Sequence, residues 1–337
     1  MIRDETDKWN TLISKFRDLG GIADNICQRN GSKGRGIFPV NKKIKSRIFT
    51  PSNLIIKKDD ICLESGNVRI KKEKNSYPKE TIEFFNYYQD NFSWGGGGKE
   101  STEEFESSLS LFSEELKILL KDNRLVDIDK RHKGSWKEVI LSQFLYAREF
   151  NFRNKLQIVP LLELVNHDSI SFQFYKSSKG ISSPNYPPLD SELTYTYANK
   201  GTLNCFFDYG FFSKETMVFS LPFNFKLEDK DLVLICKGNE LRDDLMNIKR
   251  SDNAILIDGL PISDRNNSSL PEEYFKELFR QIGLNDISII NLYKIKNYNR
   301  HIREKFLENL KSKENIASSM FYQAIVHELN LISKNSD

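Results

Sequence analysis

Apolar residues recur at helical spacing in three parts of the chain. Residues 5–19 carry an apolar stripe that stops at Gly20-Gly21, and a glycine pair in this place is typical of a helix C-cap. Helical spacing returns through residues 78–150 and again beyond residue 226. We therefore predict a leading helix, a helical middle segment and a mainly helical carboxyl-terminal part. The carboxyl-terminal patterns cover residues 241–248, 271–282, 287–298 and 302–331, with a hairpin or turn at 253–261.

Before residue 78 the pattern changes to short apolar runs that are typical of strands. These runs lie at residues 44–49, 54–56 and 61–63, and glycine, asparagine, proline and lysine pairs separate them. A glycine-rich turn, residues 31–36, leads into a further strand at Ile37. Glycine residues usually only make turns, but they also let the backbone approach a bound molecule closely.

After residue 150 we expect more strands. Residues 170–175 and 193–197 alternate apolar and polar positions, and a polar loop with three prolines is expected between them at 176–191. The two-residue period of the second strand puts Tyr195 and Tyr197 on one face. Short strands combined with helical segments predict an α+β fold.

Two segments do not fit ordinary patterns. Residues 93–98 read Ser-Trp-Gly-Gly-Gly-Gly, and so much backbone freedom predicts a mobile loop or linker. Residues 156–168 form an apolar run that indicates a buried element, yet the run ends in Asn166 and His167. Buried polar groups need partners. This pair is therefore either a satisfied pair of core side chains or part of a functional site.

Composition narrows the classes of protein. The 337 residues suggest two or three domains, and 50 Lys and Arg against 47 Asp and Glu give a net charge of only +3. This balance argues against a nucleic-acid partner. Four scattered cysteines make no disulfide framework. No signal peptide and no apolar run of membrane length are visible, so we expect a cytoplasmic monomer without a membrane partner.

Three motifs follow one another in a fixed order. Gly34-Arg35-Gly36-Ile37-Phe38 enters a strand, and Leu164-Val165-Asn166-His167 ends the apolar run. Glu192-Leu193-Thr194-Tyr195-Thr196-Tyr197 follows, with Tyr209-Gly210-Phe211 after it. The ordered set resembles SET-domain protein methyltransferases, and more narrowly the class of the Rubisco large-subunit lysine methyltransferase. The resemblance covers roughly residues 20–225.

This resemblance implies a SET-type β-fold of several small sheets with a knot-like region of strands near its end, which residues 219–223 would close. It also implies four parts of the chain. These are a leading helix with the first half of the SET domain at 1–77, a helical insertion at 78–145, the second half at 146–225, and a helical substrate-binding domain at 226–337.

The resemblance further implies a reaction and its residues. The reaction is methyl transfer from S-adenosylmethionine to a lysine of a protein substrate. A lysine amine is protonated at neutral pH, and burial beside a sulfonium disfavours that charge. Tyr197 and Tyr209 would be catalytic. The cofactor would contact Gly34, Arg35, Gly36, Arg148, Asn166, His167 and Tyr209, and the substrate would contact Arg148, Glu163, Thr194 and Tyr197. No cysteine-rich segment follows the last motif, so we predict no metal ion.

Some positions depart from the family pattern, namely Ser191, Gly201-Thr202 and Asn204. Three alternatives therefore stay open. The substrate side chain is histidine, which needs no forced deprotonation; or the chain is a catalytically silent SET module that binds a partner; or it is a hydrolase that uses His167 with Asp168. Replacing Asp168 with alanine abolishes activity only in the last case. Each candidate residue also has a structural interpretation, such as core packing for the tyrosines.

Overall fold

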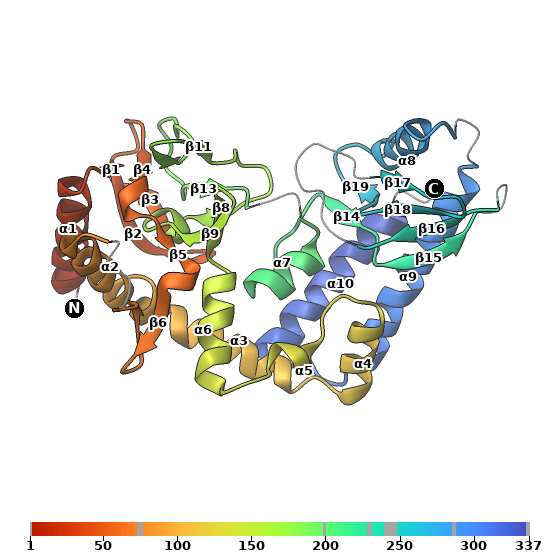
Figure 1. Cartoon of the computed structure of the whole chain (residues 1–337), viewed down its shortest axis with the longest axis horizontal. Helices are drawn as coiled ribbons and strands as arrows, with labels where there is room; N and C mark the ends of the chain where they lie inside the picture. The colour runs from red at the N-terminus through yellow and green to blue at the C-terminus, as the bar shows by residue number, and fades with distance from the viewer. Residues whose placement is uncertain are drawn as a thin grey trace. The chain divides into compact units, whose positions relative to one another are not determined.

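The computed structural model describes residues 2–72, 77–197, 200–227, 231–238, 248–284 and 288–334. The chain divides into two compact units, residues 1–103 with 140–197 and residues 104–139 with 198–337. Figure 1 follows both units along the chain from red at the amino terminus to blue at the carboxyl terminus. Each unit combines helices and small sheets around hydrophobic cores of its own, so the predicted α+β class is confirmed.

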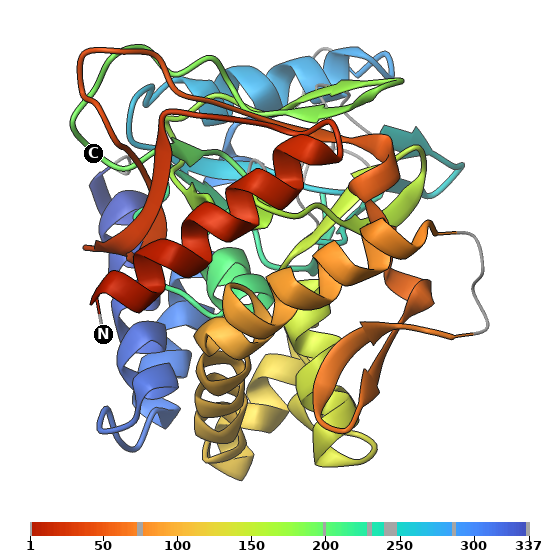
Figure 2. The same ribbon diagram turned by 90° about the vertical axis from the view of Figure 1, so that its left-hand side faces the viewer.

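Two helices of the first unit lie side by side, as Figure 2 shows. α1 (Ile2–Asp18) buries its predicted apolar stripe, and Phe16 packs against Phe84 of α2 (Lys79–Asn91) with ring centroids 5.8 Å apart. The predicted glycine pair ends α1, because the backbone N–H of Gly21 donates to the carbonyl of Phe16 at 2.9 Å. The leading helix is thus confirmed.

Short strands form several small sheets in the first unit. The strands are β1 (Ile22–Asp24), β2 (Ile26–Gly31), β3 (Gly34–Pro39), β4 (Arg47–Pro51), β5 (Ile56–Lys57), β6 (Ile61–Glu64), β7 (Asn67–Ile70), β8 (Glu149–Phe152), β9 (Lys155–Ile158), β10 (Asn166–His167), β11 (Tyr175–Ser177), β12 (Gly180–Ser182) and β13 (Thr194–Tyr195). They pair in the orders β1-β4-β12-β11, β2-β3, β5-β9-β8, β6-β7 and β10-β13. β10 and β13 run parallel, whereas the other described pairs of this unit are antiparallel.

The glycine run at 93–98, predicted to be a mobile loop or linker, instead forms a packed turn in which Gly96 and Gly97 depart from helical dihedral angles. The turn, η3 (Trp94–Gly98), follows α2 directly. Trp94 is 3% exposed, and its indole N–H donates to the carbonyl of Gly66 at 3.0 Å. Its ring also packs edge-on against Phe144, with centroids 4.9 Å apart. Burial of one large aromatic side chain gives the order that four glycines alone lack.

Two predictions after residue 168 are also wrong. Residues 170–174 are not a strand, and Ile170 and Phe172 are 80% and 74% exposed, so the alternation there has no sheet to face. The segment expected to be a loop, 176–191, instead contains most of the β11–β12 hairpin, in which β12 pairs with β4. A strand with one face exposed to solvent contains many polar residues, so its sequence resembles that of a loop.

The apolar run at 156–168 is buried as predicted, but it is not one regular element. It passes through β9, the 3-10 turn η4 (Leu162–Leu164) and β10. Val159, Leu161 and Val165 are fully buried, which leaves β10 at the edge of the core. Two further 3-10 turns, η1 (Ser52–Leu54) and η2 (Lys58–Asp60), connect strands earlier in the unit.

The second unit joins helices to two sheets. Its helices are α4 (Glu114–Asp122), α5 (Ile128–Arg131), α7 (Thr202–Tyr209), α8 (Leu270–Arg280), α9 (Ile290–Asn309) and α10 (Ile316–Lys334). The residues of α3 (Lys99–Ser110) and α6 (Trp136–Tyr146) are divided between the two units. The strands are β14 (Met217–Phe219), β15 (Phe223–Lys226), β16 (Val233–Cys236), β17 (Ile248–Arg250), β18 (Ala254–Ile257) and β19 (Pro261–Asp264), paired as β14-β19 and β15-β16-β18-β17. None of the helices in the described ranges is long and apolar enough to cross a membrane.

The carboxyl-terminal region is helical as predicted, but it also contains strands that the apolar pattern does not indicate. The predicted helix at 241–248 lies outside the described residues except for Ile248, the first residue of β17. Residues 253–261 are not a hairpin, because β18 pairs with β16 and β17 whereas β19 pairs with β14. The segment 219–223 connects β14 to β15.

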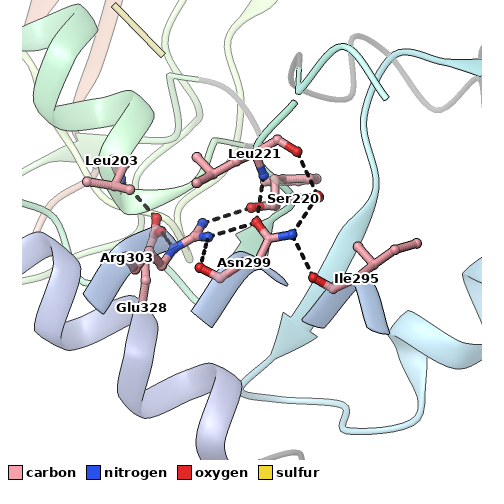
Figure 3. Close-up of polar contacts among 8 residues, drawn as sticks. Leu203, Ser220, Leu221, Ile295, Asn299, Arg303 and Glu328 are labelled. Carbon is pink, nitrogen blue, oxygen red and sulfur yellow. Dashed lines mark hydrogen bonds and ion pairs between the residues drawn. The ribbon is translucent and has the colours of Figure 1, made fainter. Parts of the chain in front are cut away.

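A buried polar cluster joins α9, α10 and the β14–β15 connection (Figure 3). We call Arg303, Glu328, Asn299 and Ser220 the Arg303 cluster. Arg303 Nε lies 2.7 Å from Glu328 Oε2, and Arg303 Nη1 donates to Asn299 Oδ1 at 2.8 Å. Asn299 Nδ2 donates to Ser220 Oγ at 2.8 Å. Glu328 Oε1 accepts the backbone N–H of Leu203 at 2.9 Å, so α10 satisfies a donor in the first turn of α7.

Candidate functional site

The three sequence motifs meet around the parallel strand pair of the first unit. β10 (Asn166–His167) pairs in register with β13 (Thr194–Tyr195). The backbone N–H of Leu193 donates to the carbonyl of Ile37 at 2.8 Å, which attaches β13 to the β2–β3 hairpin. The glycine motif, the Asn-His motif and the Glu-Leu-x-Tyr motif are therefore neighbours in space, as their shared resemblance implies.

The side-chain amide of Asn166 lies at the centre of this junction. Its Nδ2 donates to the carbonyl of Arg35 at 3.0 Å and to Glu192 Oε1 at 2.5 Å. Because both neighbours are acceptors, the NH₂ end of the amide must face them and the oxygen must face away. Within the described residues no protein group donates to Asn166 Oδ1. The site therefore presents an oriented hydrogen-bond acceptor that none of the described residues uses.

Gly36 allows this arrangement by having no side chain. A Cβ at residue 36 would overlap Glu192 Oε1 and would lie 2.8 Å from Asn166 Nδ2. The glycine at residue 36 therefore lets side chains approach the backbone of β3 closely. Gly34 has a different role, because its φ of +84° makes the turn. Burial raises the pKa of Glu192, and the hydrogen bond from Asn166 opposes this shift.

His167 and Tyr197 are connected by hydrogen bonds that involve the backbone. His167 is 4% exposed, and its Nδ1 accepts the backbone N–H of Tyr197 at 3.0 Å. The two rings lie 5.0 Å apart between centroids. The hydroxyl of Tyr197 donates to the carbonyl of Val165 at 3.1 Å. Tyr195 and Tyr197 share a face as predicted, with ring centroids 4.7 Å apart.

An ion pair attaches the tip of the β2–β3 hairpin to the end of β10. Lys33 Nζ donates to Asp168 Oδ2 at 2.8 Å and to the carbonyl of His167 at 2.7 Å. Burial raises the pKa of Asp168, but the hydrogen bonds from Lys33 and from the Ile170 N–H outweigh it, so the pKa lies below its usual value. Asp168 therefore has a structural role that the sequence alone does not indicate.

Two guanidinium groups lie against η3. A Cβ at Gly96 would lie 2.5 Å from Arg35 Nη2, and a Cβ at Gly98 would lie 3.3 Å from Arg148 Nη2. Arg148 follows α6 and does not lie within a helix; its guanidinium packs over the ring of Phe144 at 4.2 Å. Neither guanidinium forms an ion pair among the residues that the structure describes. Such groups readily bind a carboxylate.

Glu163 lies in a buried polar group beside η3. Its Oε1 accepts the hydroxyl of Ser93 at 2.7 Å, and the residue is 8% exposed. Its other oxygen, the Tyr88 hydroxyl and the Gln89 amide have no hydrogen bond of normal geometry to any described residue. Burial raises the pKa of Glu163, although the positive charge of Arg148 and the bond from Ser93 oppose the shift. Its predicted contact with the substrate stays a prediction.

Two predicted residues have well-defined local contacts. The hydroxyl of Thr194 lies 2.7 Å from that of Ser171, and the Thr194 carbonyl accepts the hydroxyl of Tyr186 at 3.0 Å. Tyr209 ends α7 in the second unit, where Lys200 Nζ lies 4.6 Å from the centre of its ring. Burial raises the pKa of Tyr209. The predicted roles of Thr194 in substrate binding and of Tyr209 in catalysis stay predictions.

The sequence analysis missed three participants in this site. Glu192 was part of a quoted motif but had no role assigned to it, and Lys33 and Ser93 carried no signal beyond their glycine-rich surroundings. A carboxylate beside a glycine motif gives no periodic pattern, so only spatial contact identifies it. The first unit brings together Gly34, Arg35, Gly36, Arg148, Glu163, Asn166, His167, Thr194 and Tyr197 as predicted neighbours.

No protein-family model and no curated protein matches the sequence. The structure is similar to the SET domain of LSMT bound to lysine and AdoHcy, with a TM-score of 0.47 and 14% identity over 98% of this chain and 90% of the other. Rubisco LSMT bound to AdoMet has a TM-score of 0.46 and 14% identity, over 97% of this chain and 90% of the other. The likeness to each of these structures covers nearly the whole chain. At this identity and TM-score it assigns no cofactor, substrate or catalytic residue.

Proposed function

We propose that the chain is an S-adenosylmethionine-dependent protein N-methyltransferase of the SET class that acts on a lysine side chain. The observation that carries the proposal is the Asn166 amide, whose oxygen is an oriented acceptor that no described protein group uses, at the place where the three motifs meet. An acceptor of this kind suits a protonated amino group, because an ammonium group offers only donors.

The residues around Asn166 fit the amino-acid end of such a cofactor. Asn166 Oδ1 accepts from its ammonium group, and the guanidinium groups of Arg35 and Arg148 bind its carboxylate. Arg35 connects the proposed ammonium site to the proposed carboxylate site, because its carbonyl accepts a hydrogen bond from Asn166 and its side chain reaches η3. Gly34 and Gly36 leave the backbone of β3 accessible to the cofactor. His167 packs beside Asn166 and accepts the backbone N–H of Tyr197. When bound, S-adenosylmethionine supplies the methyl group.

Tyr197 orients the substrate amine in this proposal. Its hydroxyl proton is directed to the carbonyl of Val165, and a phenol oxygen that donates in this way still accepts from an amine. A lysine amine attacks only without its proton, and burial among aromatic rings favours that neutral form. Tyr209 is the second candidate for a catalytic phenol, and Glu163 and Thr194 are the remaining candidates for substrate contacts. A histidine side chain is the alternative substrate.

The substrate is a protein, and residues 226–337 bind it. The compartment proposed is the cytoplasm. A catalytically silent SET-like module that binds a partner is a second alternative, and cofactor binding without methyl transfer would favour it. Positioning of the amine and the methyl donor on one axis is the main contribution that such a site makes to the rate.

Calorimetric titration of S-adenosylmethionine and S-adenosylhomocysteine tests the proposal. The parent protein is expected to bind both ligands. Asn166→Ala should weaken binding about ten- to a hundredfold, because a hydrogen bond to a charged group is worth roughly 1.5–3 kcal/mol. Asn151→Ala makes the same change at an exposed position of β8 and should bind as the parent does.

Tyr197→Phe separates binding from turnover. It should keep the affinity for S-adenosylhomocysteine and lose most methyl transfer to protein lysine, measured with a labelled methyl donor and unfractionated protein substrates. Absence of any affinity of the parent for either ligand contradicts the proposed function. Binding that Asn166→Ala leaves unchanged contradicts the assigned site.

A further inference from the structure

The carboxylate of Glu192 lies against the glycine motif. Glu192 precedes β13, and its side chain reaches β2 and β3, where a Cβ at Gly36 would overlap Oε1 and a Cβ at Gly31 would lie 3.4 Å from Oε2. It accepts the Asn166 amide at 2.5 Å. The chain thus has a half-buried carboxylate where it enters β13, in contact with both strands of the hairpin.

This carboxylate decides which way the Asn166 amide points. A carboxylate only accepts hydrogen bonds, whereas an amide has one end that donates and one that accepts. The carbonyl of Arg35 is a second acceptor on the same side, 3.0 Å from Asn166 Nδ2. Two acceptors on one side exclude the reversed amide, so Asn166 Oδ1 must face away from the hairpin.

The charge of Glu192 is only partly balanced by the described groups that face it. The charged groups that face it are Lys33, from the hairpin tip, and Asp168, from the end of β10. Lys33 is already paired with Asp168 at 2.8 Å. Among the described residues Glu192 itself forms no ion pair. A half-buried carboxylate without an ion-pair partner is costly, and a bound cation offsets that cost.

We propose that Glu192 is a positioning residue that makes this site selective for ligands with a protonated amino group. It does so by holding the acceptor of Asn166 outward and by adding a negative charge beside it. The inference rests on the proposed function for the identity of the ligand. It goes further in assigning selectivity for the amino group to a residue that need not touch the ligand.

The test compares two ligands that differ only in that group. Calorimetry measures the affinities of S-adenosylhomocysteine and of its desamino analogue for the parent, Glu192→Gln and Asp190→Asn. The parent should prefer S-adenosylhomocysteine. Glu192→Gln should lower this preference at least tenfold, chiefly by weakening S-adenosylhomocysteine, because a glutamine amide can let Asn166 reverse. Asp190→Asn, two residues away and 73% exposed, should keep the preference of the parent.

Gly36→Ala is a second variant that disturbs the contact between Glu192 and Asn166. Its methyl group displaces the Glu192 carboxylate without removing the charge and also crowds Asn166 Nδ2, so the preference should again fall. A Glu192→Gln variant that folds poorly therefore leaves the prediction testable. Equal weakening of both ligands shows a purely structural role and overturns the inference, as does an unchanged preference. If the parent binds neither ligand, the proposed function fails with it. If the parent binds both but the variants keep the preference, only the role of Glu192 fails.

Discussion

Asn166 of the first unit and Asn299 of the second are both central to polar clusters, yet only one has all its hydrogen bonds made. The amide of Asn299 donates to Ser220 Oγ and to the carbonyl of Ile295, and its oxygen accepts from the Leu221 N–H at 2.7 Å and from Arg303. The amide of Asn166 donates twice as well, but none of the described protein groups donates to its oxygen.

The carboxylates of the two clusters differ in the same way. Glu328 pairs with Arg303 and also accepts a backbone N–H, with both side chains 1–2% exposed. Glu192 has an amide partner and no ion pair within the described chain. A polar network with every group satisfied holds a fold together. A network with one oriented acceptor and one unpaired charge leaves interactions for a ligand.

The largest effect is expected when the satisfied cluster is broken. Arg303→Met leaves Glu328 buried without its cation, which should lower the free energy of unfolding by about 3–5 kcal/mol. Urea unfolding followed by circular dichroism measures this loss. Arg300→Met, one turn earlier on α9, removes an exposed ion pair and should cost less than about 1 kcal/mol. Equal stability of the two variants would mean that the Arg303 cluster is not what stabilises this unit.

An intermediate effect is expected at Glu163, where one oxygen is bonded and the other is not. Its native pKa is raised, so the native state keeps a proton that the unfolded state has released. The free energy of unfolding should therefore fall as pH rises through the interval above the usual pKa of 4.5, by at most about 1.4 kcal/mol per pH unit.

Glu163→Gln should remove this contribution and make stability less dependent on pH. Urea unfolding at several pH values from 4 to 8 measures the slope, with Glu83→Gln at an exposed position of α2 as the matched variant that keeps it. A parent slope that Glu163→Gln leaves unaltered would show that this carboxyl is ionised in the native protein, and the contrast with Glu328 would disappear.

The smallest effect is expected at the ion pair of the hairpin tip. Lys33 and Asp168 are 39% and 34% exposed, so their attraction is worth about 0.2–1 kcal/mol. Asp168→Asn should weaken S-adenosylhomocysteine binding by no more than about fivefold, with the affinity of Lys33→Met falling equally. The sequence alone predicts that a substitution of Asp168 is harmless, whereas the ion pair with Lys33 predicts a small loss of ligand affinity. Complete loss of turnover with unchanged ligand binding would instead favour the hydrolase alternative.

Sequence patterns were reliable where one face of an element meets a core. The stripe of α1 and the buried run before Asn166 follow from apolar spacing, because burial of each residue depends on its own position in the period. The same reasoning failed at 170–174, since Ile170 and Phe172 alternate like a strand but no neighbouring strand covers them. It also failed at 93–98, where a distant Phe144 orders Trp94.

Apolar spacing was enough to predict the α+β class, the leading helix and the helical carboxyl-terminal region, and the ordered motifs already contain Asn166 and Tyr197. The contacts of Glu192 with Asn166, of Lys33 with Asp168 and of Glu328 with Arg303 became visible only in the folded chain. Burial of one face of a helix or strand places apolar residues at regular intervals, so the sequence shows it. A hydrogen bond or ion pair requires only two polar atoms in contact, and no regular interval in the sequence indicates a contact between residues 26 or 135 positions apart.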